Sequence, residues 1–291
     1  MKKKIRFVIN PHSGTSKGDK VPLLIRNVID ETFYDVEVVY TEYAGHGEKI
    51  AADAVKENYH AVISVGGDGS IQEIARATIG TNTLLGIIPK GSGNGLARHL
   101  AIPMQTEDAL QVVNRNNFKT IDVMKVDDRL CVNVFGIGFD AHIANLFSKS
   151  PKRGYATYVK LVLSEFNKFQ PLNLEVTADS KAMEMKSFLL TLANGSQFGN
   201  NAMIAPEADI CDGKMDICSL KKFPFYIAPS LIYLLMKNKI NCSKYYSMFR
   251  SKEMTITSTN NIVAHLDGEP VEFGKTIHAV IQPKVLKIIV P

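Results

Sequence analysis

The sequence predicts a parallel α/β domain in the amino-terminal half of the chain and an antiparallel all-β sandwich or barrel in the carboxy-terminal half. In the first half, four apolar runs each end in a loop of small or polar residues that leads into a helix, which is typical of a parallel sheet. After Asn117 the apolar runs are mostly short and separated by turns, which is typical of antiparallel sheets. A chain of 291 residues suits two domains, and we expect them at residues 1–120 and 121–291.

The elements of the first half follow from the spacing of apolar residues. Short apolar runs predict strands at residues 5–9, 36–40, 61–65 and 84–88. Apolar residues three or four apart predict helices at residues 17–33, from the loop at 41–47 to about 57, from 70 onward, after the loop at 89–95, and at 106–114. Ser70 and Glu73 fit a capping box, which would mark the start of the third helix independently.

One turn, Gly66-Gly67-Asp68-Gly69, organises the prediction of function. The three glycines permit positive φ and leave backbone N–H groups open to a ligand, and the helix that follows adds partial positive charge at its start. The turn therefore suits a phosphate. Asp68 would repel a phosphate unless a divalent cation or bound water lies between them, so we expect a nucleotide with Mg²⁺. A tight turn without a ligand is the alternative for this motif taken alone.

Three further loops, at residues 10–14, 41–47 and 89–95, have the same small, polar character. Because the carboxyl ends of parallel strands meet at one edge of the sheet, we expect all four loops to lie there, where ligands bind to such sheets. Four unrelated turns need not all carry small polar residues at the same end of their strands. Their agreement favours a binding site over four plain turns.

The second half is predicted to be mostly strands, with two helical exceptions. The exceptions are residues 155–169 and 223–240, which are strongly apolar and, in the second case, flanked by lysines. We expect both to be helices packed on the sheet, with a position at a membrane interface as the sharper alternative. The predicted strands are residues 118–126, 130–135, 172–178, 186–193, 215–220, 254–257, 262–266, 277–281 and 285–290.

Composition narrows the class of protein. The net charge of +5 favours contact with anionic lipid surfaces or nucleotides, and no long run of lysine or arginine supports a nucleic-acid groove. The four cysteines show no metal-type spacing, which indicates a reducing, cytoplasmic setting. No apolar stretch reaches the roughly 18 residues that a membrane-spanning helix needs.

Two short motifs resemble nucleotide-binding signatures without their context. Gly136-Ile137-Gly138-Phe139-Asp140-Ala141 matches the loose dinucleotide fingerprint, but its flanks are β-rich and no parallel βαβ unit follows. Gly274-Lys275-Thr276 resembles the end of a phosphate-binding loop, but Glu269 stands where that loop requires a glycine. We interpret neither motif as a binding site.

Taken together, the ordered motifs resemble the diacylglycerol kinase catalytic family, which includes bacterial soluble diacylglycerol kinases and the sphingosine and ceramide kinases. The motifs are residues 10–14, 66–70, the run Gly91-Ser92-Gly93-Asn94-Gly95-Leu96-Ala97, and Leu266-Asp267-Gly268-Glu269. The resemblance covers nearly the whole chain. It implies an amino-terminal α/β domain like that of NAD kinases, a carboxy-terminal β-sandwich, ATP as phosphoryl donor and a membrane lipid hydroxyl as acceptor.

The resemblance also implies roles for individual residues. Glu269 resembles the proposed general base, and Asp68 resembles the carboxylate that organises Mg²⁺, although in the sphingosine kinase branch the residue matching Asp68 is favoured as the base. Asp212, in a loop similar to one that holds a structural Mg²⁺ in bacterial relatives, would supply a second metal ligand. The residues that look like nucleotide contacts are Asn10, Pro11, His12, Ser13, Gly14, Thr41, Gly66, Gly67, Asp68, Gly69, Ser70, Ile71, Gln72 and Ser92.

One departure from the family pattern concerns the acceptor. Bacterial diacylglycerol kinases commonly have an aspartate after the asparagine of the third motif, whereas this chain has Gly95 and is closer to the sphingosine and ceramide type. The acceptor lipid therefore stays open between diacylglycerol and a sphingoid or ceramide-type lipid.

Two other functions compete with a lipid kinase. An NAD kinase shares the turn at residues 66–69, but the loop at residues 10–14 and the late Asp267-Gly268-Glu269 motif argue against it. A nucleotide- or lipid-sensing module without turnover is the non-enzymatic alternative. For a lipid kinase we expect peripheral contact with a membrane surface from the cytoplasm, and the oligomeric state stays open, with a homodimer as one alternative.

Overall fold

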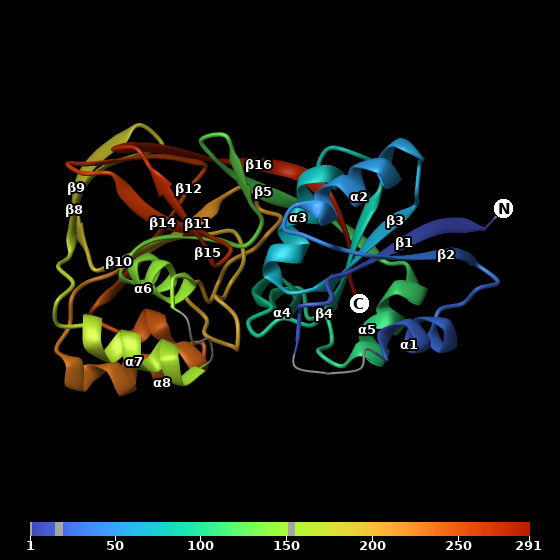
Figure 1. Cartoon of the computed structure of the whole chain (residues 1–291). Coiled ribbons are helices and arrows are strands. Elements are labelled where there is room, and N and C mark those ends of the chain that lie inside the picture. The colour runs from blue at the N-terminus through green and yellow to red at the C-terminus, as the bar shows by residue number, and fades with distance from the viewer. Residues whose placement is uncertain (1, 15–19, 151–154) are drawn as a thin grey trace. The chain divides into compact units, whose positions relative to one another are not determined.

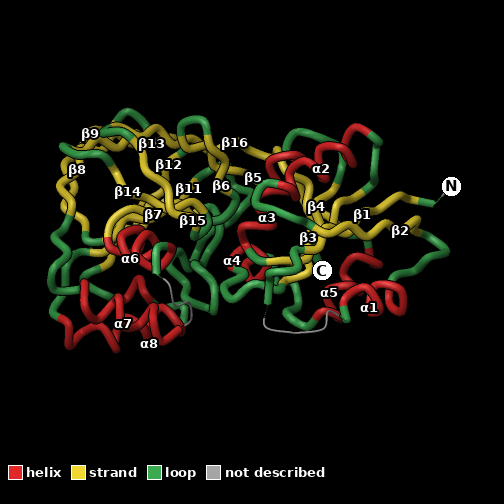
Figure 2. The backbone as a smooth tube through the Cα atoms, in the orientation of Figure 1, coloured by secondary structure: helices red, strands yellow, loops and turns green. Residues whose placement is uncertain are grey.

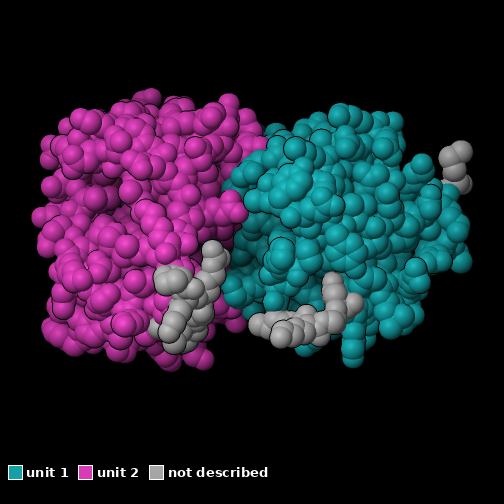
Figure 3. Space-filling view, in the orientation of Figure 1, with its two compact units in different colours: residues 1–123, 283–291 teal, residues 124–282 magenta. Residues whose placement is uncertain are grey.

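The chain folds into two compact units (Figures 1 and 3). This computed structural model describes residues 2–14, 20–150 and 155–291. Unit 1 comprises Met1–Val123 and Pro283–Pro291, and unit 2 comprises Met124–Gln282. The last residues of the chain thus return to unit 1, whereas a division at residue 120 assigns them to the second half.

Unit 1 is the expected parallel α/β domain. Its sheet has the strand order β2-β1-β3-β4-β16, and β1, β2, β3 and β4 run parallel to their neighbours. All six residues of β3 and all six of β4 are buried, as befits central strands covered on both faces. The elements are β1 (Lys3–Ile9), α1 (Val21–Val28), β2 (Tyr34–Tyr40), α2 (His46–Lys56), β3 (Ala61–Gly66), α3 (Asp68–Thr78), β4 (Leu84–Pro89), α4 (Gly95–His99) and α5 (Thr106–Arg115).

Helices cover both faces of this sheet (Figures 1 and 2). Helix α2 packs beside α3, and α1 packs beside α5 on the other face. The bounds of α1 and α3 differ from the prediction, and α1 ends at Val28 and not at residue 33. Helix α1 begins at Val21, and residues 17–19 of the predicted helix lie outside the described residues. Helix α3 begins at Asp68, two residues before the predicted start at Ser70.

The predicted capping box is therefore wrong, and both of its side chains have other partners. The residue at the helix cap is Gly67. Ser70 Oγ accepts a hydrogen bond from Asn10 Nδ2 at 3.2 Å. The Glu73 carboxylate accepts the backbone N–H groups of Gly45 and Gly47, at 2.7 and 2.9 Å, where α2 begins. Glu73 thus stabilises the start of α2 and not that of its own helix.

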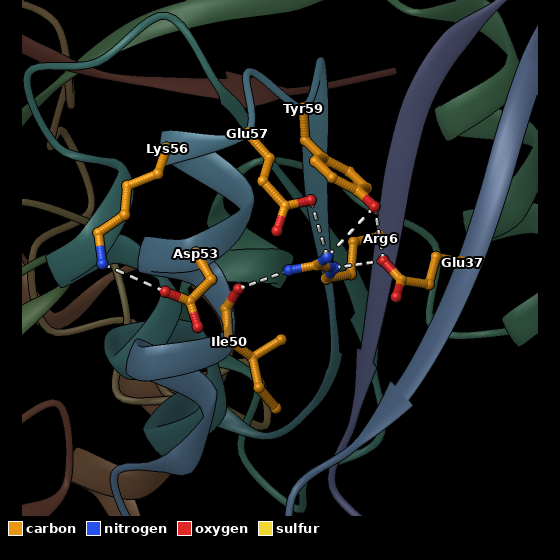
Figure 4. Close-up of polar contacts among 7 residues, drawn as sticks. All are labelled: Arg6, Glu37, Ile50, Asp53, Lys56, Glu57 and Tyr59. Carbon is orange, nitrogen blue, oxygen red and sulfur yellow. Dashed lines mark hydrogen bonds and ion pairs between the residues drawn. The ribbon is translucent and has the colours of Figure 1, made fainter.

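A buried arginine ties β1 to its neighbours (Figure 4). Arg6 Nε donates to Glu37 Oε2 at 2.5 Å, Nη1 donates to Ile50 O at 3.1 Å, and Nη2 donates to Tyr59 Oη at 3.2 Å. Burial alone would lower the pKa of Arg6, but the hydrogen bonds that Arg6 donates to Glu37 and Tyr59 outweigh it and the pKa is raised. A charge this well paired is tolerated inside a protein, so Arg6 fixes β1 against β2 and α2.

Unit 2 is a two-layered antiparallel β structure, as the sequence predicts. One sheet has the order β12-β11-β10-β7-β14-β15, and the other contains β13, β8 and β9 next to the first part of β16. Buried residues of both sheets form one core, for example Phe135 and Ile217 with Val176 and Ile256. Two strands, β5 (Phe118–Val126) and β16 (Thr276–Ile289), belong partly to unit 1 and partly to unit 2. The strands that lie wholly in unit 2 are β6 (Arg129–Cys131), β7 (Val134–Gly138), β8 (Leu172–Ala178), β9 (Lys181–Ser187), β10 (Leu189–Ala193), β11 (Met215–Leu220), β12 (Tyr246–Ser251), β13 (Glu253–Ser258), β14 (Ile262–Leu266) and β15 (Glu269–Phe273).

Three helices gather on one side of the six-stranded sheet (Figures 1 and 2). They are α6 (Phe139–Ser148), α7 (Tyr155–Glu165) and α8 (Ala228–Met236), the last preceded by the short 3₁₀ helix η1 (Phe225–Ile227). Phe139, Phe166 and Leu231 join them in one apolar cluster, which also contains Phe188 between β9 and β10. Both predicted helical segments, at 155–169 and 223–240, contain helices but are shorter than predicted, since α7 ends at Glu165 and the second segment divides into η1 and α8. Helix α6 and the short helix η2 (Ile240–Cys242) were not predicted as separate elements.

Several predicted strands of unit 2 divide or merge. The run at 130–135 forms two strands, β6 and β7, because the backbone between them turns its N–H groups toward Asp267 and away from a neighbouring strand. The run at 186–193 divides between β9 and β10, and β12 was not predicted. Conversely, the runs at 277–281 and 285–290 form one strand, β16, which continues through Pro283.

Candidate functional site

The loops with small polar residues meet at the carboxyl edge of the sheet of unit 1. Strand β1 pairs with β2 on one side and with β3 on the other. The sheet therefore extends from β1 in both directions, and the strand order reverses at β1. Ligands of such sheets bind at the carboxyl ends of the strands where the direction changes. In this chain those ends carry residues 10–14 after β1 and residues 66–70 after β3.

Asn10 joins the first of these loops to the second. Its backbone N–H donates to Val65 O at 3.1 Å, and its side-chain Nδ2 donates to Ser70 Oγ at 3.2 Å. Its Oδ1 accepts the backbone N–H of His12 at 2.9 Å, which shapes the loop from within. Pro11 and His12 are exposed, as is Gly14, whose φ of 91° favours glycine. The predicted nucleotide-binding loop is thus held rigidly where it leaves β1 and is open to a ligand beyond that point.

Asp68 joins the second of these loops to a third, residues 89–95, which follows β4. Its Oδ2 accepts the backbone N–H of Asn94 and its Oδ1 accepts that of Gly95, both at 2.9 Å. Asn94 in turn bonds to the backbone of Gly91 through both its side-chain atoms, at 3.0 and 2.7 Å. A Cβ atom on Gly91 would lie 2.5 Å from the Cα of Gly67, so this close approach requires glycine.

This geometry changes the interpretation of Asp68 and Gly95. The sequence suggested a carboxylate directed at Mg²⁺ and a carboxylate missing at position 95. In the structure both Asp68 oxygens accept backbone N–H groups, and Gly95 is buried where its N–H donates to Asp68. Asp68 therefore positions the third loop, whatever further role it has toward a metal.

The other nucleotide contacts proposed from the resemblance have different surroundings. The Thr41 backbone N–H donates to Ile9 O at 2.9 Å, which keeps the end of β2 beside β1, and Ser92 is exposed in the third loop. The Ile71 side chain is fully buried in the core, and buried Gln72 accepts a hydrogen bond from Arg76 at 2.8 Å. The side chains of Ile71 and Gln72 thus pack and pair within unit 1, and Thr41 and Ser92 are the better candidates for ligand contact.

The docked loops fit the phosphates of a nucleotide. Gly66, Gly67 and Gly69 present backbone without side chains at the start of α3, which has eleven residues and a partial positive charge at this end. For a metal, the described residues contain no cluster of three or more His, Cys, Asp or Glu side chains that could bind an ion by themselves. Mg²⁺ commonly binds to nucleotide phosphates with only one or two carboxylates, and Asp68 would be the carboxylate here.

The loop around Asp212 closes on its own backbone. Asp212 Oδ1 accepts the N–H of Lys214 at 2.9 Å, and Asp209 Oδ1 accepts the N–H of Cys211 at 3.0 Å. Gly213 has a φ of 73°, which completes the turn. Asp212 is exposed, and its role as a ligand of a structural metal stays a prediction.

The last motif of the sequence forms a tight hairpin in unit 2. Asp267 and Gly268 link β14 to β15 with φ values of 50° and 90°, and Leu266 pairs directly with Glu269. Two positive φ values in a two-residue loop are the signature of a type I′ turn, as the Asp-Gly pair predicts. Glu269 is exposed at the start of β15. The hairpin prediction is confirmed, and the turn presents the glutamate on the surface of unit 2.

Asp267 itself belongs to the core of unit 2. Its carboxylate accepts the backbone N–H groups of Val132, Asn133 and Val134 at 2.9 to 3.0 Å, and lies 3.2 Å from Cys131 Sγ. Burial raises the pKa of Asp267, although the backbone hydrogen bonds act in the opposite direction. Asp267 and Glu269 are therefore adjacent in the motif but differ in role, since only Glu269 faces outward.

Sequence reasoning missed a histidine and an aspartate beside this turn. His265 Nε2 lies 3.0 Å from Asp140 Oδ2, and the Gly268 N–H approaches His265 Nδ1 at 3.4 Å. A side chain on Gly136 would collide with this pair, since its Cβ would lie 2.3 Å from His265 Nε2. The glycines of the Gly136-Ile137-Gly138 run, which was interpreted as a false nucleotide motif, were the available signal.

Comparison with known sequences agrees with this arrangement in both units. The diacylglycerol kinase catalytic domain matches residues 4–126, and the YegS C-terminal NAD kinase beta sandwich-like domain matches residues 133–290. Proteins named probable lipid kinase YegS-like are 26% identical to the chain. The one from Pseudomonas putida aligns over 81% of this chain and 79% of its own length, and the one from Klebsiella pneumoniae over 94% and 93%.

Solved structures share the fold. A putative diacylglycerol kinase from Bacillus anthracis superposes with a TM-score of 0.80 at 20% sequence identity, covering 99% of this chain and 97% of that one. A second structure of a diacylglycerol kinase from the same organism gives a TM-score of 0.75 at 18% identity, with the same coverage. The two matched domains together span nearly the whole chain, and the chain belongs to the diacylglycerol kinase catalytic family and is a lipid kinase.

Proposed function

We propose that this lipid kinase transfers the γ-phosphate of ATP, with Mg²⁺, to the hydroxyl group of a membrane lipid such as diacylglycerol or a sphingoid or ceramide-type lipid. The observation that carries the proposal is the docking of three loops at the carboxyl edge of the sheet in unit 1. Asn10 links the first loop to the second through Ser70, and Asp68 links the second to the third through Asn94 and Gly95.

These contacts support a preorganised phosphate site. Phosphoryl transfer needs alignment and charge neutralisation more than covalent help from the protein. Loops that are fixed by their own hydrogen bonds require little reordering when a triphosphate binds. When bound, ATP supplies the transferable group and Mg²⁺ offsets the charge of its phosphates. The chain contributes the backbone N–H groups of the glycine loop and the start of α3.

Glu269 is the residue that we assign as general base. Its position at the start of β15 follows a rigid two-residue turn, and its side chain is exposed. In the proposed step the lipid hydroxyl oxygen forms a bond to the γ-phosphorus while the bond from that phosphorus to the bridging oxygen of ADP breaks. The hydroxyl proton passes to the Glu269 carboxylate, and ADP leaves.

The contacts of Asp68 favour this assignment over Asp68 as the base. Each oxygen of Asp68 already accepts a backbone N–H from the third loop, whereas the Glu269 side chain is exposed. We therefore assign Asp68 to positioning the third loop and to an accompanying Mg²⁺.

Two further proposals concern how the kinase reaches its lipid acceptor and where in the cell it acts. None of the helices within the described residues combines the length and hydrophobicity needed to cross a bilayer, so we propose that the kinase meets its acceptor through peripheral contact with a membrane. The four cysteines show no metal-type spacing in the sequence, which supports a reducing, cytoplasmic setting.

The direct experiment is to incubate the purified protein with γ-labelled ATP, Mg²⁺ and a total membrane lipid extract, and to identify the labelled product by chromatography and mass spectrometry. We expect one class of phosphorylated lipid. A parallel reaction with NAD as the acceptor tests the NAD kinase alternative. Label in NADP, or ATP binding without any labelled lipid, would contradict the proposal.

A further inference from the structure

Helix α8 is apolar on two opposite faces. Leu231, Leu234 and Leu235 point into the cluster that includes Phe166 and Phe223. On the outer face, Pro229, Ile232, Tyr233 and Met236 recur at positions i, i+3, i+4 and i+7, and the side chains of Ile232 and Tyr233 are 60% and 61% exposed. A surface helix of a globular protein normally has polar residues on this face.

The 3₁₀ helix η1 extends the same exposed surface. It contributes Phe225 and Tyr226, which are 44% and 78% exposed, immediately before α8. Tyr226 precedes Pro229 by three residues and Tyr233 by seven, which is the spacing of one helical face. We name the side chains of Phe225, Tyr226, Ile232, Tyr233 and Met236 the docking face.

The charged side chains in the segment around the docking face are all basic. Between Asp216 and Glu253 the sequence contains seven lysines and arginines and no acidic residue. Two of these are engaged within unit 2: Lys222 donates to the carbonyl oxygens of Phe166 and Phe169 at the end of α7, and Arg250 pairs with Asp216. The exposed lysines that flank η1 and α8 most closely are Lys221, Lys237 and Lys239.

An anionic membrane surface matches this combination of exposed apolar side chains and lysines best. An apolar centre of aromatic and aliphatic side chains, flanked by lysines, is the pattern of helices that lie in the interface of anionic membranes. Tyr226 and Tyr233 suit such a site because their rings are amphipathic. A second copy of the chain fits less well, because a two-fold symmetric contact would bring the lysines of both copies together.

We propose that the docking face of η1 and α8 inserts into the surface of a bilayer that contains anionic lipids, while Lys221, Lys237 and Lys239 contact the lipid phosphates. The inference deepens the proposed function, since it concerns how the kinase reaches a lipid acceptor. It requires no nucleotide, so it can be tested apart from catalysis.

The test measures binding of the full chain to vesicles of phosphatidylcholine alone and of phosphatidylcholine with phosphatidylglycerol, without ATP. We expect binding to the anionic vesicles that weakens as salt increases. Ile232→Glu/Tyr233→Glu should lower the affinity by roughly tenfold or more, since two apolar side chains leave the interface. Lys237→Glu/Lys239→Glu should lower it by about fivefold or more per lysine.

Matched controls separate the docking face from general effects. Leu23→Glu changes a side chain in α1 that is also 60% exposed, and Lys56→Glu changes an exposed lysine in α2. Both should bind the vesicles like the wild type. Thermal unfolding of each variant checks that unit 2 remains folded. Equal loss of binding in the docking-face variants and in the controls, or no loss in the docking-face variants, would overturn the proposal.

Two further readouts distinguish other outcomes. If sedimentation shows a wild-type dimer that Ile232→Glu/Tyr233→Glu converts to monomers, while vesicle binding is absent, the docking face is a subunit interface and the proposal fails. Activity on a short-chain acceptor dispersed in detergent should be retained by Ile232→Glu/Tyr233→Glu. Absence of kinase activity from the wild type in that assay would instead count against the proposed function and leave the vesicle result intact.

Discussion

Units 1 and 2 each contain an aspartate beside glycine, and both carboxylates accept hydrogen bonds from backbone N–H groups. Asp68 accepts the backbone N–H groups of Asn94 and Gly95, and Asp267 accepts those of residues 132–134. In both units a carboxylate thus fixes a loop from a distant part of the chain, where regular strand pairing has ended.

The two sites differ in exposure. Asp267 is buried, and burial raises its pKa. Asp68 is half-buried at the start of a helix and beside glycines. Asp267 bonds to the backbone of residues 132–134 inside the core of unit 2, whereas the half-buried Asp68 can hold a loop and also face a ligand. The comparison implies that substitutions at Asp267 should affect stability first and substitutions at Asp68 should affect activity first.

The largest effect is expected for Asp267→Ala. This change removes the acceptor of three backbone N–H groups inside unit 2, and unsatisfied buried groups cost about 1–3 kcal/mol each. We expect the free energy of unfolding to fall by about 3 kcal/mol or more in urea denaturation. Asp212→Ala, at an exposed turn of the same unit, should change it by less than about 1 kcal/mol. Equal stability of the two variants would contradict the role of Asp267.

Asp68→Asn should affect catalysis more than stability. The amide keeps one acceptor oxygen but turns an N–H₂ group toward a backbone N–H of the third loop, so the loop should shift without unfolding. We expect kcat/KM for ATP to fall by about 10- to 100-fold, with less than about 2 kcal/mol lost from the free energy of unfolding. Asp35→Asn, at an exposed position of β2, is the control. A variant with normal kinetics would remove Asp68 from the site.

His265→Ala tests whether the turn before Glu269 must be held in place. The change removes the partner of Asp140 and the acceptor for the Gly268 N–H. We expect kcat to fall by about tenfold while KM for ATP stays the same, because the phosphate loops are untouched. His278→Ala, an exposed histidine in β16, should have no effect on either constant. An increase in KM alone would contradict this positioning role.

The smallest effect concerns acid stability. Burial would raise the pKa of Glu37, but hydrogen bonds from Tyr59 and Arg6 outweigh it and the pKa is lowered. A lowered pKa gives stability that is present above the ordinary value of about 4.5 and is lost as the pH falls through the lower, folded-state value. Since Glu37 is 44% exposed, we expect less than about 1 kcal/mol. Urea unfolding at pH 7 and pH 4 should give a gap between wild type and Glu37→Gln that shrinks at pH 4.

The sequence predicted what depends on local pattern. Apolar spacing identified the strands and helices of unit 1, the Asp267-Gly268 pair identified the hairpin, and the four glycine loops identified the edge of the sheet where they meet. The elements and the hairpin follow from residues within a few positions of one another, and the shared edge of the loops follows from the parallel order of the strands.

The contacts that the sequence did not predict join residues far apart in the chain. Glu73 caps α2 instead of its own helix, because Gly45 lies near it only after folding. Asp267 divides a predicted strand at residues 132–134, and His265 meets Asp140 across a gap of 125 positions. Pairing over such separations leaves no local signal, although the glycines at 136 and 138 mark where the backbone needs space.

The most direct measurement is phosphoryl transfer from labelled ATP to membrane lipid by the wild type and by Glu269→Ala, with ATP affinity and unfolding measured on the same samples. We expect Glu269→Ala to bind ATP and to unfold like the wild type but to turn over about 10²- to 10⁴-fold more slowly. Full turnover by Glu269→Ala, or no transfer to lipid by the wild type, would contradict it.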